Sequence, residues 1–432
     1  SGSYGGGGGG RIAVYAADYS GFNLANIRSD GGTGNQPGGA GTIYIRDTDQ
    51  VAGTLVISMG GSSAGVTPIG LPGTNAAMFE SLVIRAGGAA RPEHAGMNFT
   101  CTGELRVEDG GRLLSVDGTW TVAGPVTVGS NGVMEIVGSL STPSNLVVQA
   151  GTLYGGRIAA AVMSVVSNGV VSSFDATSSR TYKLQLDVPG PVLVDASSRI
   201  DVSGKGYLAG RTSSNTTAGA SSGGSGGSYG GLGGNHGGTA CAVYGSYLDP
   251  DDWGSGGGTG WGGGAGGGLV RVVAGSLTLN GQLLANGNAA VGAGSGGGIY
   301  VLVGTLAGSG SIEAKGGSGS YGGGGGGRIA VYAADWSAFN TNLITAAGGT
   351  GGAAGQRGSI HITHDRFPTK VRQLVYPLVT TGASVGSINH VTFEFTRDID
   401  TNSFDPAVFL IDGQMGHVRP TGIAKVFART YD

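Results

Sequence analysis

Three aspartates form the strongest candidate site for chemistry in this sequence. Asp249, Asp251 and Asp252 lie together in YLDPDDWG, directly before a glycine-rich tract. Carboxylate oxygens at such spacing are the hard ligands that Ca²⁺ prefers. The segment lacks the glycine and the distant bidentate glutamate of an EF-hand, so a solvated acidic turn is the alternative. We therefore treat these three residues as calcium candidates and predict no other cofactor.

Other reactive residue types occur in patterns that do not predict catalysis. Gly223–Gly227 fits the pattern GxSxG, which needs a strand-to-helix turn with a histidine and an acid elsewhere. In a chain this rich in glycine and serine, the match is expected by chance. His361 and His364 are three apart on a strand-like segment, so they point to opposite faces and are poorly placed to share a metal.

The remaining acids and the two cysteines give no reaction either. Some enzymes built from stacked β coils, a fold that the strand spacing described below predicts for this chain, are polysaccharide lyases and hydrolases that use paired acids. Here the acids are dispersed, and no two can be placed on adjacent coils: Glu104, Glu108, Asp109, Asp117, Asp187, Asp195 and Asp201. A second acidic group reads as an inter-strand turn: Asp398, Asp400, Asn402 and Asp405. Cys101 and Cys241 have no metal-binding spacing and are interpreted as unpaired or buried thiols. We predict no catalytic residue.

The composition excludes several classes of protein. Glycine accounts for 93 of 432 residues, only 12% are charged, and the net charge is −3. Nucleic acid is a poor candidate partner, because neutralising its phosphates requires clustered lysines and arginines and the chain has no such cluster. No run approaches the ~20 apolar residues of a membrane span. Apolar residues at 39% still suffice for a core. Low charge with abundant glycine, serine and threonine suits a secreted surface protein.

The chain contains a long internal repeat. Residues 318–340 repeat residues 1–23 with two differences, Tyr19 to Trp336 and Gly21 to Ala338. The similarity continues as far as Ile45 and Ile362. We therefore expect tandem units, with residues 1–46 as the last coils of a preceding unit and the whole chain as an excerpt of a longer repetitive protein.

Short strands dominate the repeated part. From residue 99 to 156 a new alternating run begins almost every 8–12 residues, broken by glycine or Asn-Gly. Later runs begin at Gly268, Gly298, Gly327 and Gly358, a spacing of 29–31 residues. A strand that recurs at a fixed interval predicts stacked coils. We expect an all-β right-handed parallel β-helix over 47–364, with handedness from the crossover rule. Val270, Tyr300, Ile329 and Ile360, or their immediate neighbours, should occupy equivalent positions.

Glycine-rich insertions interrupt the coils at about 205–268. They are either flexible linker or ordered close packing, in which aromatic and apolar side chains would act as anchors. The candidate anchors are Tyr229, Leu232, Trp253 and Trp261. Beyond residue 364 the glycine runs stop, and longer alternating strands begin. Residues 365–432 are expected to be the start of an immunoglobulin-like β-sandwich, too short to be complete.

Two stretches carry a family resemblance. GTWTVAGPVTVGSNGVMEIVGSLSTPSNLVVQAGTL and GSGSIEAKGGSGSYGGGGGGRIAVY resemble giant bacterial surface proteins of the β-helical adhesin type, in the style of autotransporter and filamentous-haemagglutinin passengers. SINHVTFEFTRDIDTNSFDPAVFLIDG is similar to bacterial Ig-like domains. The resemblance implies a non-enzymatic adhesive or structural fibre at the cell surface. Its partners would be neighbouring units, further copies of itself or surface polysaccharide. A carbohydrate-active β-helix is the alternative.

Overall fold

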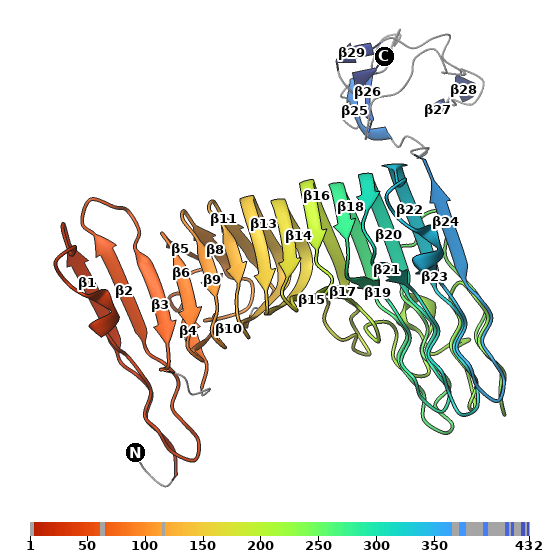
Figure 1. Ribbon diagram of the computed structural model, residues 1–432, viewed down its shortest axis with the longest axis horizontal. Helices are drawn as coiled ribbons and strands as arrows, with labels where there is room; N and C mark the ends of the chain where they lie inside the picture. The colour runs from red at the N-terminus through yellow and green to blue at the C-terminus, as the bar shows by residue number, and fades with distance from the viewer. Residues whose placement is uncertain are drawn as a thin grey trace. The chain divides into compact units, whose positions relative to one another are not determined.

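The structure is a computed structural model that describes residues 4–60, 65–114 and 117–364, together with the backbone of six short strands between 371 and 431. Contacts divide the chain into two units, Ser1–His364 and Asp365–Asp432. The fold is all-β, with 43% strand and 3% helix, and most of the strands belong to one large, largely parallel sheet. In Figure 1 the strands of the first unit follow one another in chain order from β1 to β24.

The first unit begins with one long coil and then a run of short strands. The long coil contains β1 (Arg11–Ala16), the 3-10 helix η1 (Leu24–Asn26) and β2 (Thr42–Asp47). The short strands are β3 (Thr54–Ser58), β4 (Thr67–Ile69), β5 (Ala76–Phe79), β6 (Leu82–Arg85), β7 (Ala89–Pro92), β8 (Asn98–Cys101), β9 (Leu105–Val107), β10 (Arg112–Leu114), β11 (Thr119–Val122) and β12 (Val126–Val128).

In the rest of the unit, long strands that bend through two or three sides of a coil are interspersed with short ones. They are β13 (Val133–Gln149), β14 (Thr152–Val166), β15 (Val170–Ser172), β16 (Lys183–Val194), β17 (Arg199–Asp201), β18 (Leu269–Leu279), β19 (Gln282–Leu284), β20 (Gly298–Ala307), β21 (Ser311–Glu313), β22 (Arg328–Asp335), β23 (Ile344–Thr345) and β24 (Ser359–Thr363). Two more 3-10 turns are η2 (Ser213–Asn215) and η3 (Thr341–Leu343).

The strands from β3 to β24 form three parallel ladders that the chain visits in turn. The first ladder runs through β5, β8 and β11 to β22 and β24. The second runs through β3, β6, β9 and β12 to the end of β20. The third runs through β4, β7 and β10 to β21 and β23. The bent strands β13, β14, β16, β18 and β20 belong to more than one ladder.

Parallel register stacks equivalent apolar side chains on one another, as the alternation of strand residues requires. In the second ladder a continuous column of side chains, each at most 1% exposed, passes through Leu82, Leu105, Val126, Leu146, Met163, Val192, Leu277 and Leu306. The first ladder buries Phe99 and Trp120, whose ring centroids are 4.2 Å apart in a stacked arrangement. One core therefore runs along the ladders.

The predicted equivalence of later strands is confirmed with a shift of one residue. Val270 pairs with Ile299, Ile299 with Ile329, and Ile329 with Ile360, all in parallel. Tyr300 pairs instead with Arg271 and Ala330, and these three side chains lie on the face of the sheet directed away from the core. The spacing located the strands, and the alternation of buried and outward residues fixed which neighbour lies inside.

The two copies of the repeat form the same local structure. The pairing of β1 with β2 begins at Arg11 and Thr42, and the pairing of β22 with β24 begins at Arg328 and Ser359. The second register is therefore the first one shifted by the length of the repeat. The turns η1 and η3 are each capped by an asparagine side chain, that of Asn23 or Asn340. After the first copy the chain diverges, because β2 pairs antiparallel with β3.

The glycine tracts are ordered, which decides between the two sequence-based alternatives. Along the tract 322–327, Gly323 and Gly326 donate their N–H to the following coil, at Ala353 and Gln356. Gly324 and Gly327 donate to the segment just before them, and Gly322 and Gly325 donate to the glycine-rich insertion. Every third N–H thus points the same way, as expected for an extended backbone with three residues per turn.

The second unit contains two small antiparallel sheets. Their strands are β25 (Val371–Tyr376), β26 (Thr392–Phe395), β27 (Ile411–Gly413), β28 (Gly416–Val418), β29 (Lys425–Phe427) and β30 (Thr430–Tyr431). The order β25-β26-β30-β29 makes one sheet, and β27 pairs with β28 in the other. Antiparallel pairing agrees with the alternating sequence, and the Ig-like assignment stays a prediction.

Candidate functional site: the acidic loop

The three predicted aspartates lie in a loop that covers the outward face of the first ladder. We call residues 248–253 the acidic loop. β18 directs Arg271 outward between two buried valines, and β20 places Tyr300 beside it. The Arg271 guanidinium lies 3.7 Å from the centre of the Tyr300 ring. Its Nη1 donates to Asp249 Oδ1 at 2.7 Å and to Pro250 O at 3.1 Å. Arg271 therefore fastens the loop to the sheet.

The other two aspartates turn toward different partners. Asp251 pairs with Lys183 Nζ at 3.0 Å, with Arg271 at a longer 3.9 Å. Asp252 accepts a hydrogen bond from the Tyr207 hydroxyl at 2.6 Å and from the Ser213 hydroxyl at 3.2 Å. Burial, and then the Asp252 carboxylate, raise the pKa of Tyr207 well above its usual value. Tyr207 is accordingly a neutral donor at physiological pH.

Backbone contacts on both sides complete the attachment. The Tyr332 hydroxyl donates to Leu248 O at 2.6 Å, and the indole N–H of Trp253 donates to Tyr182 O at 3.0 Å. The Tyr244 hydroxyl donates to Trp253 O at 2.6 Å, and the Tyr244 carbonyl oxygen accepts a hydrogen bond from Arg328 Nε at 2.8 Å. The arrangement is suited to holding a loop on a sheet, with each charge already compensated.

A calcium ion would have to compete with these partners. Within residues 4–60, 65–114 and 117–364, no group of three or more His, Cys, Asp or Glu side chains is arranged to hold a metal ion. Asp249, Asp251 and Asp252 face an arginine, a lysine and a tyrosine respectively. Calcium binding at these residues stays a prediction. If it occurs, it requires the loop to exchange its ion pairs for the metal.

The GxSxG match and the histidines have structural surroundings. Ser225 is fully buried, and its hydroxyl oxygen accepts the backbone N–H of His236 at 3.0 Å. The His236 ring stacks on Tyr321 with centroids 4.2 Å apart. His364 stacks on Trp336 at 3.6 Å, whereas His361 lies against Tyr332. The two histidines thus contact different rings.

The dispersed carboxylates also have individual partners. Arg106 pairs with Glu104 and Glu108, Arg180 with Asp117, and Arg157 with Asp187. Cys101 and Cys241 are both buried and unpaired, as the sequence suggested. Burial raises the pKa of the Cys101 thiol to about 12. The acidic group Asp398, Asp400, Asn402 and Asp405 lies outside the described residues.

Sequence reasoning missed the partners of the acidic loop. Arg271, Lys183 and Tyr207 are 22, 68 and 45 residues from the aspartates they contact. No local motif connects them. The one usable signal is Arg271 itself, since a charged residue inside the apolar run GLVRVV must face outward on a strand that is otherwise buried.

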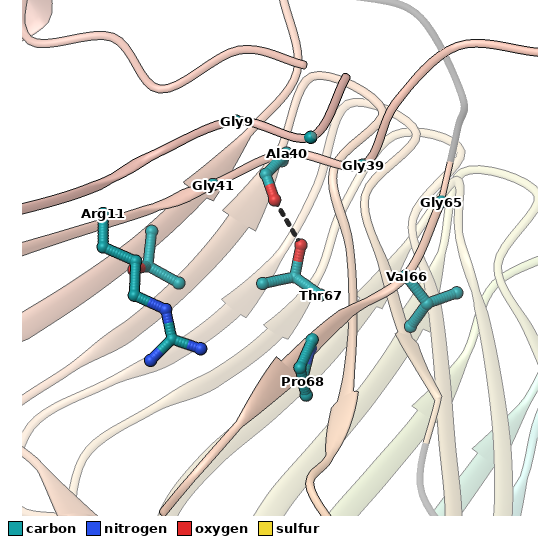
Figure 2. A pocket seen from close by; sticks show the side chains of 11 residues that line it. Gly9, Arg11, Gly39, Ala40, Gly41, Gly65, Val66, Thr67 and Pro68 are labelled. Atoms are coloured by element: carbon teal, nitrogen blue, oxygen red, sulfur yellow. Dashed lines mark hydrogen bonds between the residues drawn. The ribbon is translucent and has the colours of Figure 1, made fainter. Parts of the chain in front are cut away.

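Two hollows border the first coil. One, of about 260 Å³, is lined by the glycine tract, Arg11 and the segment around Thr67. Figure 2 shows Arg11 beside this hollow and the hydrogen bond from the Thr67 hydroxyl to Ala40 O, at 2.5 Å. The other, of about 600 Å³, lies between η1, β2 and β3, with Leu24, Ile43 and Val56 in its wall. β1 of the first coil is also more exposed than its later copy β22.

Comparison with known proteins gives no match: no family model, no curated protein and no solved structure matches the chain significantly. In the part of the chain that the structure describes, no helix is long and apolar enough to cross a membrane. Function must therefore be argued from the fold and the repeat.

Proposed function

We propose that residues 1–364 form a right-handed parallel β-helix and that the chain is part of a non-enzymatic structural or adhesive fibre at the cell surface. The observation that carries the proposal is the three parallel ladders with a continuous core, together with a repeated coil at both ends of one unit. Right-handedness rests on the general preference of parallel crossovers. Residues 365–432 are proposed as an Ig-like module.

A β-helix of this kind acts through its stiffness. Each coil adds ~4.8 Å, and every coil shares backbone hydrogen bonds with the next. The insertion at 205–268 thickens the rod on one side, where its glycines pack against coils β18 to β24. Neighbouring units, further copies of the protein or surface polysaccharide are the proposed partners, and the proposed location is extracellular.

The state of the carboxylates favours a structural role over a carbohydrate-active one. Paired catalytic acids must be free to exchange protons and must face one substrate site. Here Asp187, Asp201, Asp249 and Asp251 each lie within 3.4 Å of an arginine or lysine. Each of these carboxylates is thus held by its own cation instead of facing a second acid across a shared substrate site.

Two measurements test the proposal. Electron microscopy of the purified chain should show an elongated rod, and incubation with pectin or alginate should release no sugar. Reproducible sugar release that one Asp→Asn change on a coil face abolishes would favour the carbohydrate-active alternative. A compact particle would contradict the fibre.

A further inference from the structure

The two copies of the repeat share their sequence but differ in what covers them. Tyr4 and Tyr15 are 87% and 55% exposed, whereas their counterparts Tyr321 and Tyr332 are 37% and 2% exposed. In the second copy these rings lie under the glycine-rich insertion, where Tyr332 donates to Leu248 O. The Tyr332 hydroxyl thus has a backbone acceptor above it, whereas Tyr15 contacts the Tyr44 ring and the Arg46 guanidinium and stays half exposed.

The basic and apolar side chains show the same contrast. Arg328 is 9% exposed, donates to Tyr244 O and lies over the Tyr229 ring, but Arg11 is exposed. Phe339 is 6% exposed in the core, whereas Phe22 is 56% exposed. Exposed large apolar residues gathered on one coil are unusual for a free surface and typical of an interaction site.

The glycines show why the covering segment fits. A Cβ on Gly322 or Gly325 would clash with backbone atoms of the insertion, at Gly226 and Gly231 respectively. A Cβ on the corresponding Gly5 or Gly8 would meet nothing within 4 Å. Glycine is needed at these positions only when a second backbone lies against them. The first copy keeps the glycines without the covering backbone.

Hydrogen-bond donors are left over at the same positions. Gly322 donates to Gly224 O at 3.0 Å, and Gly325 donates to Gly227 O at 2.9 Å. In the described part of the chain, no glycine-rich insertion lies against Gly5 and Gly8 to accept their N–H groups. β1 also pairs with β2 alone among the described strands, whereas β22 lies between β20 and β24.

We propose that the face formed by Tyr4, Gly5, Gly8, Arg11 and Tyr15, called the open face, docks the glycine-rich insertion of a second copy of this unit. The edge of β1 would at the same time receive β20 of that copy. The proposal rests on the proposed tandem-fibre function and names its joint. The complementary surface is the one that already covers the identical residues of the second copy.

The contacts of the joint can be specified residue by residue. Arg11 binds the carbonyl that corresponds to Tyr244 O and lies over the ring that corresponds to Tyr229. The Tyr15 hydroxyl donates to the carbonyl that corresponds to Leu248 O. The backbone N–H groups of Gly5 and Gly8 donate to the carbonyl oxygens that correspond to Gly224 O and Gly227 O in the second copy of the unit. All five residues of the open face are identical to their counterparts in the covered copy.

A tandem chain provides the test. Residues 1–317 are placed before the complete chain 1–432, so that Gly317 precedes Ser1 as it naturally precedes Ser318. Tyr19→Trp in the inner copy distinguishes its peptides by mass. The change should not disturb the fold, because tryptophan is the residue that the second copy has at the corresponding position, Trp336. We expect amide hydrogen exchange of inner residues 4–21 to slow at least tenfold relative to the single chain, toward the rate of 321–338.

Gly8→Ala separates docking from folding. In the single chain this change should leave the melting temperature unaltered, because its Cβ has open space, whereas Gly325→Ala should lower it. In the tandem chain, Gly8→Ala in the inner copy should return exchange to the fast rate. Protection in the single chain that grows with protein concentration would also support the proposal, with the second copy supplied by another molecule.

Two outcomes would overturn the joint. One is exchange of inner residues 4–21 as fast in the tandem chain as in the single chain. The other is slow exchange that Gly8→Ala does not change. Electron microscopy of the same tandem chain reports on the fibre separately, since a rod with an unprotected open face would refute the joint and leave the proposed function intact.

Discussion

Some ion pairs on the outer surface of the first unit connect neighbouring coils. Arg157 binds Asp187 at 3.0 Å and Lys205 binds Asp175 at 2.7 Å, each pair separated by 30 residues, about one long coil. Exposed pairs of this kind contribute at most about 1 kcal/mol each. Their value lies in register, since a one-residue slip of a coil would turn one partner to the other face of the sheet.

Glu135 differs from these paired residues, because its half-buried side chain on β13 forms no ion pair among the described residues. Burial raises the pKa of its carboxyl, and the charge of Arg112 on the neighbouring β10 lowers it only in part. The folded state therefore holds the proton more tightly than the unfolded state. The contribution to stability is complete below the unfolded pKa of about 4.3 and is lost as pH rises through the folded pKa.

Glu135→Gln should consequently stabilise the protein at pH 7 and have little effect at pH 3. We expect the melting temperature at pH 7 to rise by roughly 1–2 °C. Thermal unfolding followed by circular dichroism at both pH values checks the prediction. Glu313→Gln is the comparison variant, because Glu313 has Lys315 at 2.9 Å. A larger gain at pH 3 than at pH 7 would contradict it.

At the scale of elements, the acidic loop and the glycine segments depend on the sheet beneath them. Neither has a core of its own. The glycine segments exchange hydrogen bonds with one another and with the turns between β18 and β24, and the acidic loop is held from β18 and β22 as well as by Lys183 and Tyr207. Tight backbone approach replaces side-chain packing in the glycine segments. The loop instead relies on Arg271, Tyr300 and Tyr332.

Arg271→Gln should loosen the acidic loop. It removes the cation from a side chain that is only 16% exposed and leaves Asp249 without that ion pair. We expect a loss of about 1–3 kcal/mol in the free energy of unfolding. Arg157→Gln is the matched control, since its side chain is 70% exposed, and its loss should stay within about 0.5 kcal/mol. Equal losses for both variants would refute the role of Arg271.

At the scale of the molecule, the first unit places one sequence in two environments. Residues 4–16 and 321–333 are identical. The first segment borders one hollow and presents exposed apolar side chains, whereas the second is buried from Arg328 to Ala333. Local stability within the unit should therefore be uneven.

Hydrogen exchange of the single chain measures this difference with a built-in control. Peptides covering 4–21 and 321–338 differ in mass through Tyr19 and Trp336, yet their amides up to Ala16 and Ala333 have equal intrinsic rates. We expect the first to exchange at least tenfold faster. Equal protection would mean that the first coil is as stable as the second despite its open face.

The sequence by itself determined the strand content, the coil spacing and the equivalence of the two repeat copies. Alternation and glycine breaks are local properties, so they located the starts of β18, β20, β22 and β24 within one residue. Identical residues also adopted identical backbone structure, because their hydrogen bonds to the following coil lie within the repeated segment.

Only the tertiary structure decided the state of the glycine tracts and the partners of the acidic loop. Glycine permits both disorder and close packing, and the outcome depends on whether another backbone lies within reach. Asp249, Asp251 and Asp252 likewise meet Arg271, Lys183 and Tyr207 only because stacked coils bring distant segments together. These contacts depend on the three-dimensional neighbours of a residue, which its local sequence does not encode.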